Sequence, residues 1–429
     1  MTKKLNKDNK LFSFPNLSVQ GYYDPLSQSI VFCELKRQDL MEVIKDPFNL
    51  DRIHKTKLII HEVCHYLDHI TTLKGQQLLA SICDAFNALK NEDAHENELW
   101  RLVRLNKLVN SLKFEKYYKN LNEKTFQGGS IKDWTLKSTI GCRYDLDGKI
   151  DISKPIIFNT FSYRGEFVGR IPFSIEALWE ASSMAVEALA QIKAIQNLNN
   201  SDQQIVAANL FIKESLDWIY NSELLTYSSA AHLVGISLNI DDIAVAFRIA
   251  KTLATISLNL PDEYIQQLRA PEYLELTEER KTAFLNSNDP SCLFYRLVRN
   301  LQESRENIMD ENLVNIEKIL QINNLPEQQI LEKSIENAMR KIGEDILKGA
   351  HSYDFVKLHV WGTALFQEIG LDGANEDPQY LINLARLPSM PIIFEEEDFD
   401  NENNILVNRY NHVSIMDDKI KEFIKACGY

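Results

Sequence analysis

The sequence has no uninterrupted apolar run approaching eighteen residues, so it predicts neither a membrane-spanning helix nor attachment to a membrane. The basic, polar stretch at residues 1–10 is not followed by the apolar segment that a secretory signal contains. We therefore expect a soluble protein in the cytoplasm. Its 429 residues, 45% of them hydrophobic, are enough for a large core and for two domains.

Closely spaced cysteines are also missing. The six cysteines lie far apart, and no Cys-x-x-Cys pair occurs. This spacing argues against a zinc ribbon or a disulfide scaffold, and it indicates reduced, mostly buried thiols.

Basic residues are too few for a nucleic-acid-binding protein. Lysine and arginine number 47 against 61 acidic residues, which gives a formal net charge of -14. Because nucleic-acid binding requires a basic face that neutralises phosphates, we expect no nucleic-acid partner.

Histidine is scarce, yet four of the nine histidines lie between residues 54 and 69. Two of them, His61 and His65, flank Glu62, and apolar residues surround this motif without any Gly or Pro until Gly75, which predicts a buried helix. On a helix, residues four apart share one face, so both imidazoles could bind one tetrahedral zinc ion with Glu62 beside its open position. This is the His-Glu-x-x-His signature of zinc hydrolases; a helix with incidental histidines is the competing interpretation.

The segments around the motif predict a small sheet and further helices. Residues 18–23 and 29–35 have strand composition on either side of a turn, so we expect a hairpin. This hairpin could offer an edge to an extended peptide, or it could only cover the motif helix. Helical patterns follow at 76–89 and 99–121.

Between residues 126 and 172 the composition changes to β-branched, aromatic and glycine residues, which predicts two hairpins. Such an insertion often builds one wall of a cleft. Tyr144, Tyr163 and Arg164 are therefore candidates to stabilise an oxyanion, although aromatic residues are also common in hairpins of no catalytic importance.

A strongly helical segment at 174–190 carries three glutamates. Ser174 is a suitable N-cap, and Glu176, Glu180 and Glu187 follow one stripe of the helix among small residues. Burying carboxylates on such a face is costly unless a cation or a hydrogen-bonded histidine lies opposite them. The stripe is therefore a candidate source of a metal ligand.

The polar residues 196–204 are the best candidate for a linker, and the chain beyond them is nearly all helical in pattern. We expect an α+β, predominantly helical protein with two domains, residues 1–195 and 196–429. The second would be a scaffold or would bind a protein partner.

The hairpin, the His61-Glu62-x-x-His65 helix and the later glutamate-bearing helix resemble the zincin metallopeptidases, in particular the gluzincin branch. The resemblance covers residues 15–190 and implies a zincin-like core with a small β-sheet. In gluzincins the third zinc ligand is a glutamate on a second helix, often followed by small residues, which suits Glu180. In a thermolysin-like arrangement Glu176 would instead be the ligand and Glu180 would orient a zinc histidine. We favour Glu180.

Two further residues on the motif helix are candidates near the metal. The sequence lacks the glycine turn of metzincins, and on a continuous helix the Cα atoms of His61 and His69 would lie about 12 Å apart, close to the limit for sharing one ion. His69 is then expected behind the ligands or in the cleft wall, with a ligand role as the alternative. Asp68 could accept a hydrogen bond from a ligating histidine or face solvent.

The resemblance implies a zinc-dependent peptidase that hydrolyses an intracellular protein or peptide, with Zn2+ as cofactor and Glu62 as the general base. One alternative is a non-enzymatic metal-binding interaction protein, because a fold does not establish activity. Another is a latent toxin or defence effector protease, which the large helical second half suggests.

Overall fold

The computed structural model describes residues 20–90, 96–112, 114, 116–129, 133–145, 148–310, 313–346, 349, 351–372, 377–399, 401 and 404–427. Helices account for 64% of the structure and strands for 14%, which confirms the α+β, predominantly helical class. Within these residues no helix combines the length and the apolar character needed to cross a bilayer.

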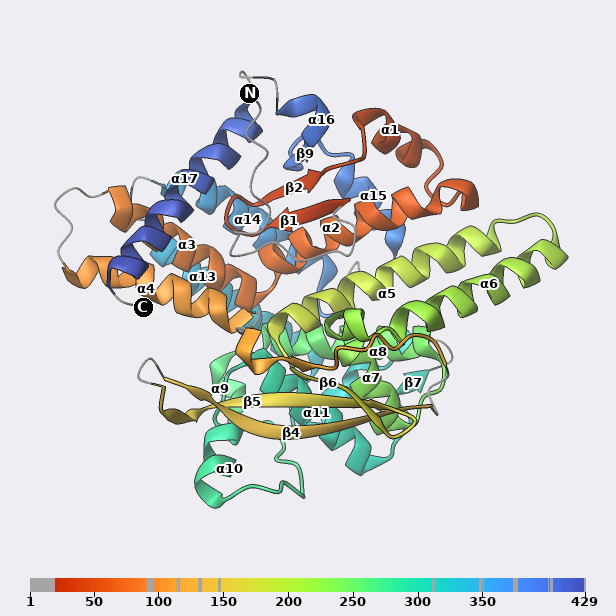
Figure 1. The fold of residues 1–429 in the computed structure, drawn as a ribbon. Coiled ribbons are helices and arrows are strands. Elements are labelled where there is room, and N and C mark those ends of the chain that lie inside the picture. Colours follow the sequence, from red (N-terminus) through yellow and green to blue (C-terminus); the bar gives the residue numbers. More distant parts are fainter. Residues whose placement is uncertain are drawn as a thin grey trace.

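The first sheet has the strand order β1-β2-β9, with β1 at an edge. Its antiparallel hairpin, β1 (Gly21–Asp24) and β2 (Ser29–Phe32), confirms the prediction. The third strand, β9 (Ile392–Phe394), pairs in parallel with β2, in a half of the chain that the sequence predicts to be nearly all helical. This pairing places β9, from late in the chain, beside the N-terminal hairpin (Figure 1).

The predicted motif helix is α2 (Ile53–Thr71), which follows α1 (Arg37–Lys45) and the short η2 (Leu50–Arg52). From Ile59 to Thr71 every side chain of α2 is buried. The next helix, α3 (Leu73–Lys90), begins almost at once, and a Cβ at Gly75 would collide with the carbonyl of His69. Only glycine permits this close turn between the two helices.

The second sheet has the order β3-β6-β5-β4 and is entirely antiparallel. It contains the two predicted hairpins in β4 (Trp134–Tyr144), β5 (Ile150–Tyr163) and β6 (Glu166–Pro172). The helix predicted to reach residue 121 is too long: α4 (Glu96–Leu112) is followed by η3 (Lys116–Tyr118) and β3 (Asn120–Leu121). Pairing of β3 with β6 and burial of Tyr118 compete successfully with local helical propensity.

Helix α5 (Ile175–Gln196) lies at the centre of the fold, in contact with α2, α7 (Leu225–Leu238) and α8 (Ile243–Asn259). Its predicted N-cap is confirmed, since the Ser174 side chain accepts a hydrogen bond from the Ala177 backbone. Helix α6 (Ser201–Ile219) begins within the predicted linker, so only a short turn separates it from α5. Figure 1 shows α5 and α6 as a helical hairpin that extends away from the body.

The remaining elements complete a mainly helical second half. One large hydrophobic cluster includes buried residues from both predicted domains, from Tyr23 to Ile424, so the two segments share a core. The elements are η5 (Ser222–Leu224), α9 (Asp262–Ile265), α10 (Glu278–Leu285), α11 (Pro290–Ser304), β7 (Met309–Asp310), β8 (Leu313–Val314), α12 (Ile316–Ile322), α13 (Gln328–Ile346), α14 (Ser352–Ile369), α15 (Pro378–Ala385), α16 (Glu395–Asp398) and α17 (Ile405–Ala426).

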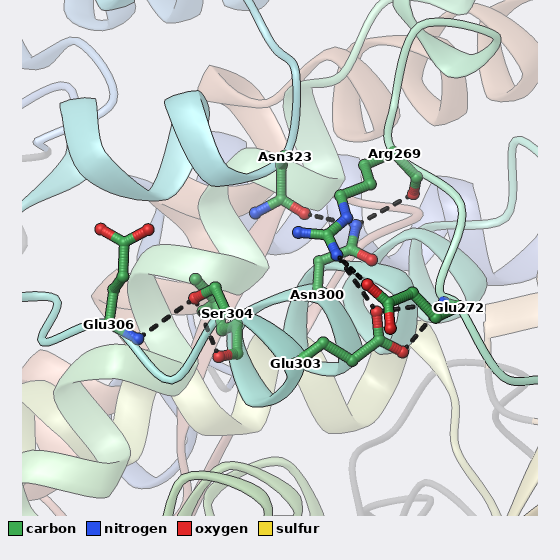
Figure 2. A network of polar contacts seen from close by, with 8 residues as sticks. Arg269, Glu272, Asn300, Glu303, Ser304, Glu306 and Asn323 are labelled. Carbon is green, nitrogen blue, oxygen red and sulfur yellow. Dashed lines mark hydrogen bonds and ion pairs between the residues drawn. The ribbon is translucent and has the colours of Figure 1, made fainter.

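A polar network fixes the segment after α9 against α11 and α12 (Figure 2). The buried Asn300 amide donates to the Arg269 carbonyl at 2.9 Å and to Asn323 Oδ1 at 2.8 Å. The Arg269 guanidinium contacts Glu272 and Glu303 at 3.1 and 3.6 Å. Because buried amides are costly when unpaired, this network stabilises one arrangement of the loop, and it serves structure rather than the site below.

Candidate metal centre

Three side chains from two helices converge in the core. His61 and His65 lie one turn apart on α2, and Glu180 faces them from α5. The two Nε2 atoms are 3.0 Å apart. Glu180 Oε2 lies 3.3 Å from Nε2 of His61 and 3.7 Å from Nε2 of His65.

These separations fit a zinc site. With bonds of about 2.0–2.1 Å in a tetrahedral site, ligand atoms lie about 3.3–3.4 Å apart. The three observed distances bracket that value. The donor set, two imidazoles and one carboxylate, is one that catalytic zinc sites use and that leaves the fourth position for a water or substrate.

The outer nitrogen of each imidazole has a partner on α5. Glu187 Oε1 lies 2.6 Å from His61 Nδ1, and Ser183 Oγ lies 3.3 Å from His65 Nδ1. Ligating histidines generally need such a partner, because it fixes the ring and the tautomer and directs the other nitrogen to the ion. Lys57 contacts the second oxygen of Glu187 at 3.5 Å and balances its charge.

The centre is rich in buried negative charge. Burial raises the pKa of Glu62 to about 7, and the charges of Glu180 and Glu187 act in the same direction, against His61. Burial likewise raises the pKa of Glu180 to about 7, although His61 opposes this effect. Glu62 Oε2 and Glu180 Oε1 have no hydrogen-bond partner among the described residues. A divalent cation held between the imidazoles would offset this unbalanced charge.

The two imidazoles differ in charge preference. Burial lowers the pKa of His61, but Glu180 and Glu187 outweigh it and raise that pKa well above the usual value. Burial and the neighbouring His61 lower the pKa of His65. The pair therefore holds at most one positive charge, and a bound cation can take the place of that charge.

Glu176 and His69 lie outside the cluster. Glu176 is buried in the first turn of α5, one turn before Glu180. His69 is fully buried, with Nδ1 at 2.5 Å from the Tyr23 hydroxyl. Burial lowers its pKa to about 3, so it is a neutral core residue and not part of a cleft wall.

One of the two alternatives for Asp68, that it faces solvent, is wrong because Asp68 is buried. Glu187 and Ser183 lie next to the outer nitrogens of His61 and His65. Burial raises the pKa of Asp68 to about 7, against the effects of Lys251 and Ser182. Its neighbours thus come from α5 and α8, which the spacing along α2 does not reveal.

The structure does not bring the predicted oxyanion residues to the histidines. Tyr144 is 51% exposed and stacks on Tyr118. Tyr163 packs against Trp134, and the guanidinium of Arg164 pairs with Asp133 at 3.0 Å in a hairpin turn. None of the three lines the cavity next to His61. Their sheet lies on the side of α7 and α8 away from β1 and β2 (Figure 1).

A cavity of about 350 Å³ adjoins the centre on the side of His61 and Glu187. Helices α6, α7 and α8 supply most of its remaining wall, including Tyr227, which sequence patterns do not single out. Burial raises the pKa of Tyr227, and nearby glutamates add to this effect, so it stays a neutral phenol. Glu62 does not line this cavity and is only 2% exposed.

Glu187 and Ser183 are the other residues whose roles the sequence leaves unassigned. Both lie on the glutamate-bearing stripe of α5, where Glu187 follows Glu180 by two turns. That regular spacing was the only available signal for them.

Comparisons of the chain with protein-family models, with curated proteins and with solved structures find no match.

Proposed function

We propose that the protein is a zinc-dependent peptidase that acts on a protein or peptide in the cytoplasm. The observation that carries this proposal is the convergence of His61 Nε2, His65 Nε2 and Glu180 Oε2 at zinc-ligand separations, with Glu62 next to them in sequence. The motif and the donor set are similar to those of the zincin metallopeptidases that the sequence resembles, and each outer nitrogen has the partner that a ligating histidine needs.

Zinc held by these residues would polarise the substrate carbonyl and lower the pKa of a water molecule. Glu62 would take the proton from that water and deliver it to the leaving amine. Glu187 and Ser183 would keep both imidazoles oriented while this occurs.

One feature favours a second candidate, a metal-binding protein without turnover. Glu62, His65 and Glu180 are each at most 2% exposed, and the Tyr23 backbone hydrogen-bonds to Glu62 from β1. The hairpin therefore covers the Glu62 side of the centre. A peptidase would have to admit substrate from the cavity beside His61 or move β1.

Removal of the metal tests the proposal. Protein stripped with a chelator should lose hydrolysis of a mixed peptide library, and one equivalent of Zn2+ should restore it, because the carbonyl is then polarised again. Mass spectrometry of the library and metal analysis are the measurements, with Mg2+ as control because this nitrogen-rich site disfavours it. Zinc uptake without cleavage would favour the second candidate. Cleavage by metal-free protein would contradict both.

Replacing Glu187 with alanine is expected to weaken zinc binding about 10- to 100-fold, because His61 loses the partner that orients it. Competition with a chromophoric chelator measures the dissociation constant. Glu214→Ala is the matched control, since Glu214 lies on the rim of the same cavity but is exposed and outside the cluster. Equal affinities of both variants and the parent would contradict the assigned role of Glu187.

A further inference from the structure

Apolar residues make up about half of the wall of the cavity beside His61. Four helices contribute aliphatic, aromatic or thioether side chains to it, and this wall faces the candidate metal ligand. The residues are Leu58 of α2, Met184 and Ala188 of α5, Phe211, Trp218 and Ile219 of α6, and Ile243, Ala244 and Phe247 of α8.

Charged groups at the cavity are balanced or solvated. Glu187 is held by His61 at 2.6 Å and by Lys57 at 3.5 Å, so its charge is compensated inside the protein. Glu214 and His54 are exposed and lie at the rim. A charged side chain entering this cavity would lose its hydration without meeting a buried counter-ion, which is strongly unfavourable.

The size of the cavity suits one large side chain. Its volume of about 350 Å³ falls at the lower end of the range for small-molecule sites, roughly 300–1,000 Å³. Tyr227 and Ser215 add hydroxyls to the apolar part of the wall, and Gln20 adds an amide. Apolar pockets with a few such polar groups typically select by shape and hydrophobicity.

We propose that this cavity is the specificity pocket of the enzyme and binds a large apolar side chain of the peptide substrate next to the bond that is cleaved. The inference rests on the proposed peptidase function, because only that function makes His61 the boundary between the pocket and the reacting carbonyl. Helices α6 and α8, which lie outside the sequence region resembling zincins, then determine which peptides are accepted.

The test separates binding from hydrolysis. Metal-free protein is titrated with the N-acetyl amides of phenylalanine, leucine, alanine, lysine and glutamate by ligand-observed NMR. The phenylalanine and leucine amides should bind at least about 10-fold more tightly than the other three, because single apolar groups in such pockets change affinity by about 10- to 200-fold. The zinc-loaded protein should cleave a peptide library beside large apolar residues.

Ala244→Phe should fill the pocket from α8 and weaken the binding of phenylalanine amide at least about 10-fold. Ala208→Phe is the control, because Ala208 lies on α6 outside this cavity and should leave binding within about twofold of the parent. Circular dichroism verifies that both variants fold.

The possible outcomes are decisive. The proposed pocket would be refuted if all five amides bound equally or if the lysine or glutamate amide bound more tightly. It would also be refuted if Ala244→Phe and Ala208→Phe bound phenylalanine amide equally well. If the amides bind as expected but no peptide is cleaved, the peptidase proposal fails while the apolar site stands. If cleavage occurs without preference for large apolar residues, the pocket fails and the peptidase stands.

Discussion

The Glu62→Gln variant is expected to retain zinc and to lose about 10²- to 10⁴-fold in kcat, the range that general acid–base catalysis contributes. Glutamine has the size of glutamate but cannot accept and return a proton. Glu62 is not one of the three converging ligands, so its replacement leaves the donor set intact. Metal analysis and the rate of hydrolysis of one peptide, measured on the same preparation, check both parts of this expectation.

The same substitution at Glu176 provides a matched control. Glu176 is also a buried glutamate close to the centre, but it lies one turn before the ligand position and outside the cluster. Glu176→Gln should therefore keep kcat within a few-fold of the parent. Parent-like turnover by Glu62→Gln would refute the role of Glu62, and equal losses in both variants would indicate a general effect of removing buried charge.

The local parts of the fold could be predicted from the sequence. The helix around His61 follows from a continuous apolar pattern without Gly or Pro, and the hairpin of β1 and β2 follows from a turn between two short β-rich runs. The N-cap at Ser174 needs only one side chain and the next backbone amides. The helix, the hairpin and the N-cap each depend on contacts between residues that are close together in the sequence.

The parts that depend on distant contacts could not be predicted. Strand β9 is three residues long and exists because β2 offers it an edge more than 350 residues earlier in the chain. Helix α4 ends early because β3 pairs with β6. The sequence of β9 does not show that β2 is its partner, and the sequence of β3 does not show that β6 is its partner.

The candidate site shows the same division. Spacing on one helix brings His61 and His65 together, and the stripe on α5 identifies Glu180 as the facing carboxylate. The partner of each outer nitrogen depends on how α2 and α5 pack together, so the spacing along α2 could not show that Glu187 lies next to His61. Tyr144, Tyr163 and Arg164 belong to a segment that lies between α2 and α5 in the sequence. In the fold this segment forms a sheet away from the histidines.

Replacing Glu180 with alanine is expected to weaken zinc binding by more than about 100-fold, whereas Glu176→Ala should bind zinc nearly as the parent does. Loss of a group behind a ligand alone costs about 10- to 100-fold in affinity, and loss of a ligand costs more. Glu180 Oε2 reaches both imidazole nitrogens, and Glu176 is outside their cluster. Isothermal titration with Zn2+ measures the two affinities.

Thermal unfolding with and without zinc gives an independent measure of the same difference. Ligand at 100 times its dissociation constant stabilises a fold by about 2.7 kcal/mol, so the parent and Glu176→Ala should gain stability and Glu180→Ala should not. Without zinc the order of the unfolding temperatures should change, because Glu180→Ala removes a buried carboxylate that lacks a full set of hydrogen-bond partners. The metal-free Glu180→Ala variant is therefore expected to unfold at a temperature equal to or above that of the metal-free parent. A zinc-dependent gain in Glu180→Ala, with its loss in Glu176→Ala, would instead make Glu176 the third ligand.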